Sequence, residues 1–109
     1  MNPKFTDQKE CLEAIGRALL KGVPEPWTQI DALIERRGNG LIGYELSYRP
    51  ERDPSLVEPF VVGNAAAGVD FADCFNQLAR LISTPEKGLF RDCIYQIKRD
   101  GKYTADYKY

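Results

Sequence analysis

The first pattern of apolar residues along the chain has helical spacing. Leu12, Ile15 and Leu19 form one stripe. Asp7 precedes this stripe as an N-cap, and Glu10, three residues later, is placed to complete a capping box. Two prolines follow in residues 23–27 and prevent any continuation. We therefore predict a helix over residues 7–21, with Gly22 as its C-terminal stop.

A second helical pattern lies in the later half of the chain. Its apolar face consists of Phe71, Cys74, Phe75, Leu78, Leu81 and Ile82. Asp70 is a suitable N-cap, and Thr84-Pro85 ends the helix because the residue before a proline avoids helical geometry. Residues 63–68, with the sequence GNAAAG, are predicted to be a connector of small residues.

Alternation with a period of two predicts strands between these helices. Residues 27–36 and 41–49 each place apolar side chains on one face, and the glycine-rich residues 38–40 are typical of a turn. Residues 56–62 are a candidate third strand. Pro59 lacks an N–H group, which restricts such a strand to a sheet edge.

The last 18 residues, 92–109, predict a second hairpin around Asp100-Gly101. A two-residue loop would mix apolar and polar side chains on both faces. A three-residue loop over residues 99–101, with Gly101 left-handed, separates them. The inner face then collects Cys93, Tyr95, Ile97, Tyr103, Ala105 and Tyr107, whereas Lys98, Lys102, Thr104 and Asp106 face water.

Together these elements predict an α+β fold in the order α-β-β-(β)-α-β-β. We expect an antiparallel sheet of four to five strands, with two helices packed on one face. A chain of 109 residues, of which 43% are apolar, is long enough for one core, so residues 1–109 are predicted to be a single domain.

Charge and cysteine content narrow the class of protein. The net charge of −1 does not favour nucleic-acid binding. The charge is unevenly distributed, because residues 25–73 hold nine acidic and four basic side chains. Three cysteines without CxxC spacing suggest core packing rather than disulfides or a metal site. No segment has the apolar length of a membrane span or the pattern of a signal peptide, so we expect a cytoplasmic protein.

The chain contains no histidine, the commonest general acid and base. The carboxylates of Glu35 and Glu45, on adjacent predicted strands, are the best catalytic pair available, but solvated surface charges are the simpler interpretation. We therefore predict a protein that is not an enzyme and uses no cofactor or metal. Trp27 and Tyr109 are interpreted as partly exposed contact residues.

Several short motifs resemble the YezG-like immunity proteins of polymorphic toxin systems. They are Ile15-Gly16 within the first helix, Val23-Pro24-Glu25-Pro26-Trp27 after it, and Asp100-Gly101-Lys102-Tyr103 with Asp106 and Tyr109 at the end. The resemblance covers essentially the whole chain, as a single YezG-like domain. It implies an antitoxin that binds a cognate secreted toxin, often a nuclease, inside the producing cell.

The resemblance does not say which surface binds, so we combine it with the charge pattern. An acidic surface suits a basic nuclease cleft. The candidate contact residues are Trp27, Glu35, Glu45, Glu51, Asp53 and Glu58. We expect a toxin domain as the partner, no direct nucleic-acid or membrane binding, and a monomer or weak dimer when free. The alternative is a non-catalytic adaptor or homodimeric module that pairs through an exposed strand edge.

Overall fold

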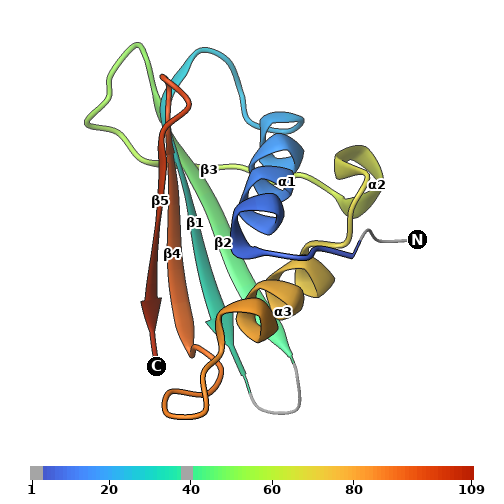
Figure 1. The fold of residues 1–109 in the computed structure, drawn as a ribbon. Coiled ribbons are helices and arrows are strands. Elements are labelled where there is room, and N and C mark those ends of the chain that lie inside the picture. The colour runs from blue at the N-terminus through green and yellow to red at the C-terminus, as the bar shows by residue number, and fades with distance from the viewer. Residues whose placement is uncertain (1–3, 38–40) are drawn as a thin grey trace.

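The protein folds into two layers, a five-stranded antiparallel sheet and a set of helices on one of its faces (Figure 1). The computed structural model describes residues 4–37 and 41–109. In chain order the elements are α1 (Gln8–Leu20), β1 (Trp27–Arg36), β2 (Ile42–Pro50), β3 (Glu58–Pro59), α2 (Asn64–Ala67), α3 (Phe71–Ile82), β4 (Asp92–Lys98) and β5 (Tyr103–Lys108). The strands lie in the order β3-β2-β1-β4-β5. The predicted fold class is confirmed.

Strand β1 is the centre of the sheet because it pairs with both β2 and β4. Its bounds are those predicted from the alternation. Ile30, Ala32 and Ile34 are buried against the helices, as expected for one face of a strand. The turn predicted at residues 38–40 lies outside the described residues.

The final hairpin has the predicted three-residue loop. The Lys98 N–H donates to the Lys102 carbonyl at 2.8 Å, and the Gly101 N–H donates to the Lys98 carbonyl at 3.0 Å. Gly101 has a φ of 89°, the left-handed conformation that favours glycine. Tyr95 pairs with Ala105 across the two strands, so the predicted apolar face is confirmed.

Helix α1 lies directly on this hairpin. The Tyr95 hydroxyl donates a 2.7 Å hydrogen bond to the Leu12 carbonyl. A Cβ atom on Gly16 would lie 2.9 Å from the Tyr95 hydroxyl oxygen. Gly16 therefore allows the helix backbone to approach the sheet. Burial in this contact raises the pKa of the Tyr95 hydroxyl above its ordinary value.

Both long helices begin at the predicted caps. The Asp7 carboxylate accepts from the Glu10 N–H at 2.8 Å, and Asp70 accepts from the Asp73 N–H at 3.3 Å. The capping box on α1 is only half formed, because the Glu10 carboxylate accepts from the Thr6 hydroxyl, outside the helix.

Gly22 has a different role from the one predicted. The residue that caps α1 is Lys21, in right-handed geometry, and Gly22 is not among the described glycines with positive φ. A Cβ atom on Gly22 would instead collide with the Val62 side chain. The glycine is needed for close packing and does not end the helix by a left-handed turn.

The segment between the two hairpins differs most from the prediction. Only Glu58 and Pro59 of residues 56–62 form a strand, which lies at the sheet edge beside β2. The predicted connector contains a four-residue helix, α2, closed by Gly68 with a φ of 78°. This helix is too short to show an apolar period, and so the sequence pattern misses it.

All three cysteines are buried, which confirms the prediction of core packing. Burial raises the pKa of both Cys11 and Cys93 to about 12. A thiol with so high a pKa is not a nucleophile at neutral pH.

Candidate functional site

One face of the sheet carries no helix and presents a candidate binding surface (Figure 1). Across this face, Leu33 of β1 lies opposite Ile94 of β4. Glu45 of β2 is the neighbour of Leu33 on one side, and Asp106 of β5 is the neighbour of Ile94 on the other. The four side chains form one row in which two carboxylates flank two apolar groups.

The next row of the same face adds two more carboxylates. Glu35 of β1 lies opposite Asp92 of β4. Lys108 of β5 lies beside Asp92 in the same row. We call the other six side chains of these two rows the acidic end of the open face: Leu33, Glu35, Glu45, Asp92, Ile94 and Asp106. Five of them, all except Asp106, line one shallow depression of about 470 Å³.

The four carboxylates differ in how far they are neutralised. Glu35 forms an ion pair with Arg37 at 3.5 Å, and Asp92 forms one with Arg91 at 3.1 Å. Among residues 4–37 and 41–109, no ion pair is formed by Glu45 or Asp106. These two carboxylates lie at either end of the row that contains Ile94 and Leu33, of which Leu33 is 46% exposed.

Beyond the apolar pair the face changes from acidic to polar. Asp31 accepts hydrogen bonds from Gln29 at 2.8 Å and from Gln96 at 2.9 Å. The Lys98 ammonium donates to the Gln29 side chain at 2.8 Å. These bonds fix the centre of the face, because each long side chain is held by a neighbour from its own or an adjacent strand.

The far end of the open face is basic. Arg49 of β2 lies opposite Gln29, and Lys98 and Lys102 follow on β4 and at the start of β5. The open face therefore has opposite charges at its two ends, with the apolar pair nearer the acidic end.

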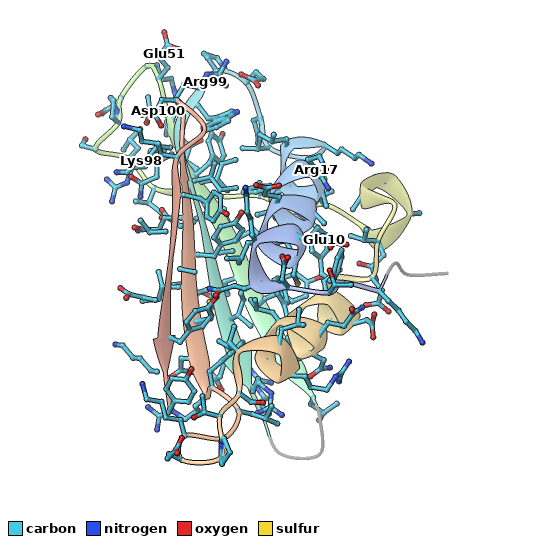
Figure 2. All side chains as sticks on the ribbon, viewed as in Figure 1. Glu10, Arg17, Glu51, Lys98, Arg99 and Asp100 are labelled. Atoms are coloured by element: carbon cyan, nitrogen blue, oxygen red, sulfur yellow. The ribbon has the colours of Figure 1, made fainter. Side chains whose placement is uncertain are left out.

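Glu51 and Asp53 lie away from the acidic end. Glu51 follows β2 and lies at the end of the sheet that also carries Lys98, Arg99 and Asp100 (Figure 2). Six residues of extended chain separate it from Glu45, a distance of about 20 Å. The predicted acidic residues therefore form two separate groups and not one surface.

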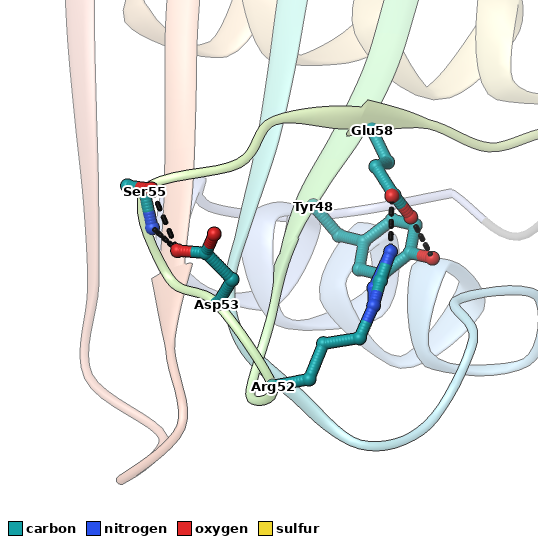
Figure 3. Close-up of polar contacts among 5 residues, drawn as sticks. All are labelled: Tyr48, Arg52, Asp53, Ser55 and Glu58. Carbon is teal, nitrogen blue, oxygen red and sulfur yellow. Dashed lines mark hydrogen bonds and ion pairs between the residues drawn. The ribbon is translucent and has the colours of Figure 1, made fainter.

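Within the second group, side-chain bonds already occupy the carboxylates of Asp53 and Glu58 (Figure 3). Glu58 accepts from the Tyr48 hydroxyl at 2.9 Å and is paired with Arg52. The bond from Tyr48, and then the contacts with Arg52, hold the pKa of Glu58 below its ordinary value. Asp53 accepts from the Ser55 hydroxyl at 2.6 Å, which lowers the pKa of Asp53 as well. These carboxylates stabilise the loop.

Trp27 is not the partly exposed contact residue that we expected. Its side chain is only 4% exposed, and its indole N–H donates to Glu25 at 3.2 Å. The Arg99 guanidinium lies over the ring, 4.7 Å from its centre, and forms an ion pair with Glu25. Trp27 thus joins the final hairpin to the start of β1.

Sequence reasoning missed Asp92, Asp106, Leu33 and Ile94 as members of the surface. Residues 80–109 hold seven basic and four acidic side chains, so the charge counted by segment places Asp92 and Asp106 in a basic part of the sequence. Pairing of β4 with β1 places Asp92 beside Glu35, and it places Asp106 at the opposite end of the row that Glu45 begins. The alternation in the last hairpin did predict that Asp106 faces water, but the strand order that identifies its neighbours was not available from the pattern.

The described residues offer little support for other kinds of site. Within residues 4–37 and 41–109, no three cysteine, aspartate or glutamate side chains are grouped to hold a metal ion. None of the described helices is long and apolar enough to span a membrane. No protein-family model matches the chain, and no curated protein matches it.

Proposed function

We propose that this protein is an immunity protein, which binds a cognate secreted toxin in the cytosol and neutralises it in a tight complex. The observation that carries the proposal is the acidic end of the open face. There an apolar pair, exposed Leu33 and half-buried Ile94, lies among four carboxylates on a sheet face that none of the described helices covers. The resemblance of the sequence motifs to YezG-like proteins supplies the class of partner.

The physical chemistry of the acidic end suits such a partner. An apolar centre with a polar rim is the usual anatomy of a protein interface. A nuclease that binds phosphates needs a basic cleft, and opposite charge on its inhibitor raises the association rate and disfavours other partners. Inhibition by occupation of a cleft requires no catalytic group, in agreement with a chain that lacks histidine.

The proposal is tested by protection of cells. The toxin domain encoded directly upstream is expressed with and without this protein, and we expect the protein to restore growth. Leu33→Lys should abolish protection because it places a cation in the apolar centre. The matched control is Leu20→Lys, since Leu20 is 48% exposed and lies on α1, in the other layer. Thermal unfolding confirms that both variants are folded.

Two results would contradict the proposal. If the wild-type protein does not restore growth, the proposed immunity function is wrong. If Leu33→Lys, Leu20→Lys and the wild-type protein protect equally, the immunity function stands, but the acidic end is not its binding site.

A second candidate is a non-catalytic adaptor or homodimeric module, and the sheet edges favour it. Strand β3, at one end of the strand order, has two residues, so the edge of β2 is unpaired beyond it. An unpaired edge is a template for another strand. Measurement of mass in solution separates the candidates, because a stable dimer that forms without any toxin supports the second.

A further inference from the structure

The outer edge of β2 is open over most of its length. Strand β3 pairs with β2 only at Ser47 and Tyr48. One further backbone bond follows, from the Phe60 N–H to the Leu46 carbonyl at 3.1 Å. Beyond it the chain turns away toward α2, so Ile42 to Glu45 have no strand on that side (Figure 1).

The direction of the unpaired backbone groups follows from this last bond. Because the Leu46 carbonyl faces outward, and backbone groups alternate along an antiparallel strand, the N–H and C=O of Tyr44 also face outward. The N–H and C=O of Glu45 face inward, toward β1, where Glu45 pairs with Leu33. The edge therefore offers a donor and an acceptor at Tyr44 in the geometry of a β ladder.

Apolar side chains surround this edge. Tyr44, Val57 and Val61 line a groove of about 790 Å³ together with Leu33 and Glu45. Val61 is 87% exposed, an unusual position for a large β-branched residue beside an open strand. The Tyr44 ring packs on Phe71 and Phe75 of α3, which fixes the strand at this point.

The other edge of the sheet is protected in the usual way. Strand β5 is flanked by Lys102 and carries Asp106 and Lys108 along its length. Charged side chains on an edge discourage pairing with another chain. The β2 edge has Gly43 and Tyr44 at its centre, and Glu45 is the one charged residue of Ile42–Leu46.

We propose that the partner of this protein adds an extended segment to the β2 edge at Ile42–Leu46, as a strand that continues the line of β3. This inference rests on the proposed function, because it takes the toxin domain as the partner. Backbone pairing would supply affinity, and alternate side chains of the segment would supply specificity.

The charges beside the edge specify the chemistry of that segment. On the open face Glu45 is adjacent to the edge and forms no ion pair within the described residues. A lysine or arginine of the added strand, on that same face, would lie within reach of its carboxylate. On the helix side, the Tyr44 ring, which packs on Phe71 and Phe75, favours an apolar side chain. The expected segment therefore alternates basic and apolar residues.

The added strand would extend the acidic end of the open face. Glu45 belongs both to that surface and to the β2 edge, since its side chain faces the uncovered side next to the edge. A basic segment on the edge and a basic cleft over Leu33 would thus meet at the same carboxylate. This continuity favours one toxin domain as the occupant over a second copy of the chain.

Amide hydrogen exchange at single residues tests the inference directly. The protein is measured alone and with a catalytically inactive form of the toxin domain encoded upstream. We expect the Tyr44 amide to exchange rapidly in the free protein and about tenfold or more slowly in the complex, because it gains a ladder bond. The Glu45 amide is an internal control, since β1 protects it in both states.

A variant separates the edge from the rest of the surface. Val61→Lys should weaken the complex about tenfold or more, because a cation in the groove repels a basic segment and disrupts its apolar contact. Leu20→Lys is the matched control, because it also replaces an exposed apolar side chain with lysine but lies on the helical layer. It should leave the affinity for the toxin domain unchanged. Both substitutions are at exposed positions, so folding is preserved.

The outcomes distinguish this inference from the proposed function. A complex in which the Tyr44 amide exchanges as in the free protein overturns the strand addition and leaves the immunity function standing. Absence of any complex with the toxin domain overturns both. Slower Tyr44 exchange at high protein concentration without toxin would identify a second copy as the occupant and overturn the inference as stated.

Discussion

The contact between Tyr95 and Gly16 shows how a single residue type sets the distance between the two layers. Glycine is ordinarily unfavourable inside a helix, by about 1 kcal/mol relative to alanine. Here the missing Cβ leaves room for the Tyr95 hydroxyl, which donates to the Leu12 carbonyl. The Ile15-Gly16 pair that supports the family resemblance therefore has a structural reason that is independent of function.

A double-mutant cycle tests this contact. Gly16→Ala should destabilise the protein by about 1–2 kcal/mol despite its better helix propensity, because overpacking outweighs the gain. Tyr95→Phe should cost about 1 kcal/mol through the lost hydrogen bond. In the Tyr95→Phe background, Gly16→Ala should be neutral or stabilising. Denaturant unfolding gives the free energies, and additive effects would show that the two residues do not interact.

At the residue scale, the pattern predicted what depends on neighbours along the chain. Asp7 and Asp70 cap their helices, and Gly101 takes the left-handed conformation, because these roles are set within a few residues. Gly22 was misinterpreted because its neighbour is Val62, forty positions later. Trp27 was misinterpreted for the same reason, since Arg99 of the final hairpin covers it.

At the scale of elements, the loop between β2 and β3 depends on one ionised carboxylate. Glu58 accepts from the Tyr48 hydroxyl and is paired with Arg52, and these interactions lower its pKa (Figure 3). The same hydrogen bond raises the pKa of Tyr48, as expected for a neutral phenol that donates to a carboxylate. Ionised Glu58 and protonated Tyr48 therefore stabilise each other and hold β3 at the sheet edge.

This arrangement predicts a pH dependence of the loop. Because the folded-state pKa of Glu58 is lowered, its stabilisation is complete above the ordinary glutamate value of about 4.3 and is lost as pH falls through the lower folded value. Amide chemical shifts of residues 52–59 should follow that titration. Glu58→Gln should remove the part of the transition that reports Glu58 and leave the part that reports Asp53, whereas Glu51→Gln, in the same loop, should keep both. A midpoint at the ordinary value would contradict the assignment.

Elements with a clear period were predicted well, and those without one were not. The strand at Trp27–Arg36 and the long helix at Phe71–Ile82 have strong two-fold and helical periods. The four residues of α2 show no period, and β3 is shortened to Glu58–Pro59 because the chain leaves the edge to reach the helical layer. Tertiary connections decide such short elements.

At the scale of the whole molecule, strand order creates the candidate surface. The sequence predicts two outward carboxylates on the first hairpin, Glu35 and Glu45. Only the placement of β4 beside β1 adds Asp92 and Asp106 and encloses the Leu33–Ile94 pair. The charge counted by segment assigned Asp92 and Asp106 to a basic part of the sequence. Antiparallel pairing then joins this basic part to the acidic part in one sheet. The distribution of charge on the folded surface therefore had to come from the structure.

The claim that the acidic end of the open face meets a basic toxin is tested most directly by association kinetics across salt concentrations. The double variant Glu45→Lys/Asp106→Lys reverses the two carboxylates that have no ion pair within the described residues. Glu51→Lys/Glu86→Lys makes the same change in net charge at exposed loop positions. Stopped-flow measurement with the inactive toxin domain gives the association rate of each.

We expect the first variant to associate about tenfold or more slowly than the wild-type protein at low salt, with a weaker dependence on salt. The control variant should retain most of the rate and of the salt dependence. Equal association rates and equal salt dependence for both variants would contradict the account.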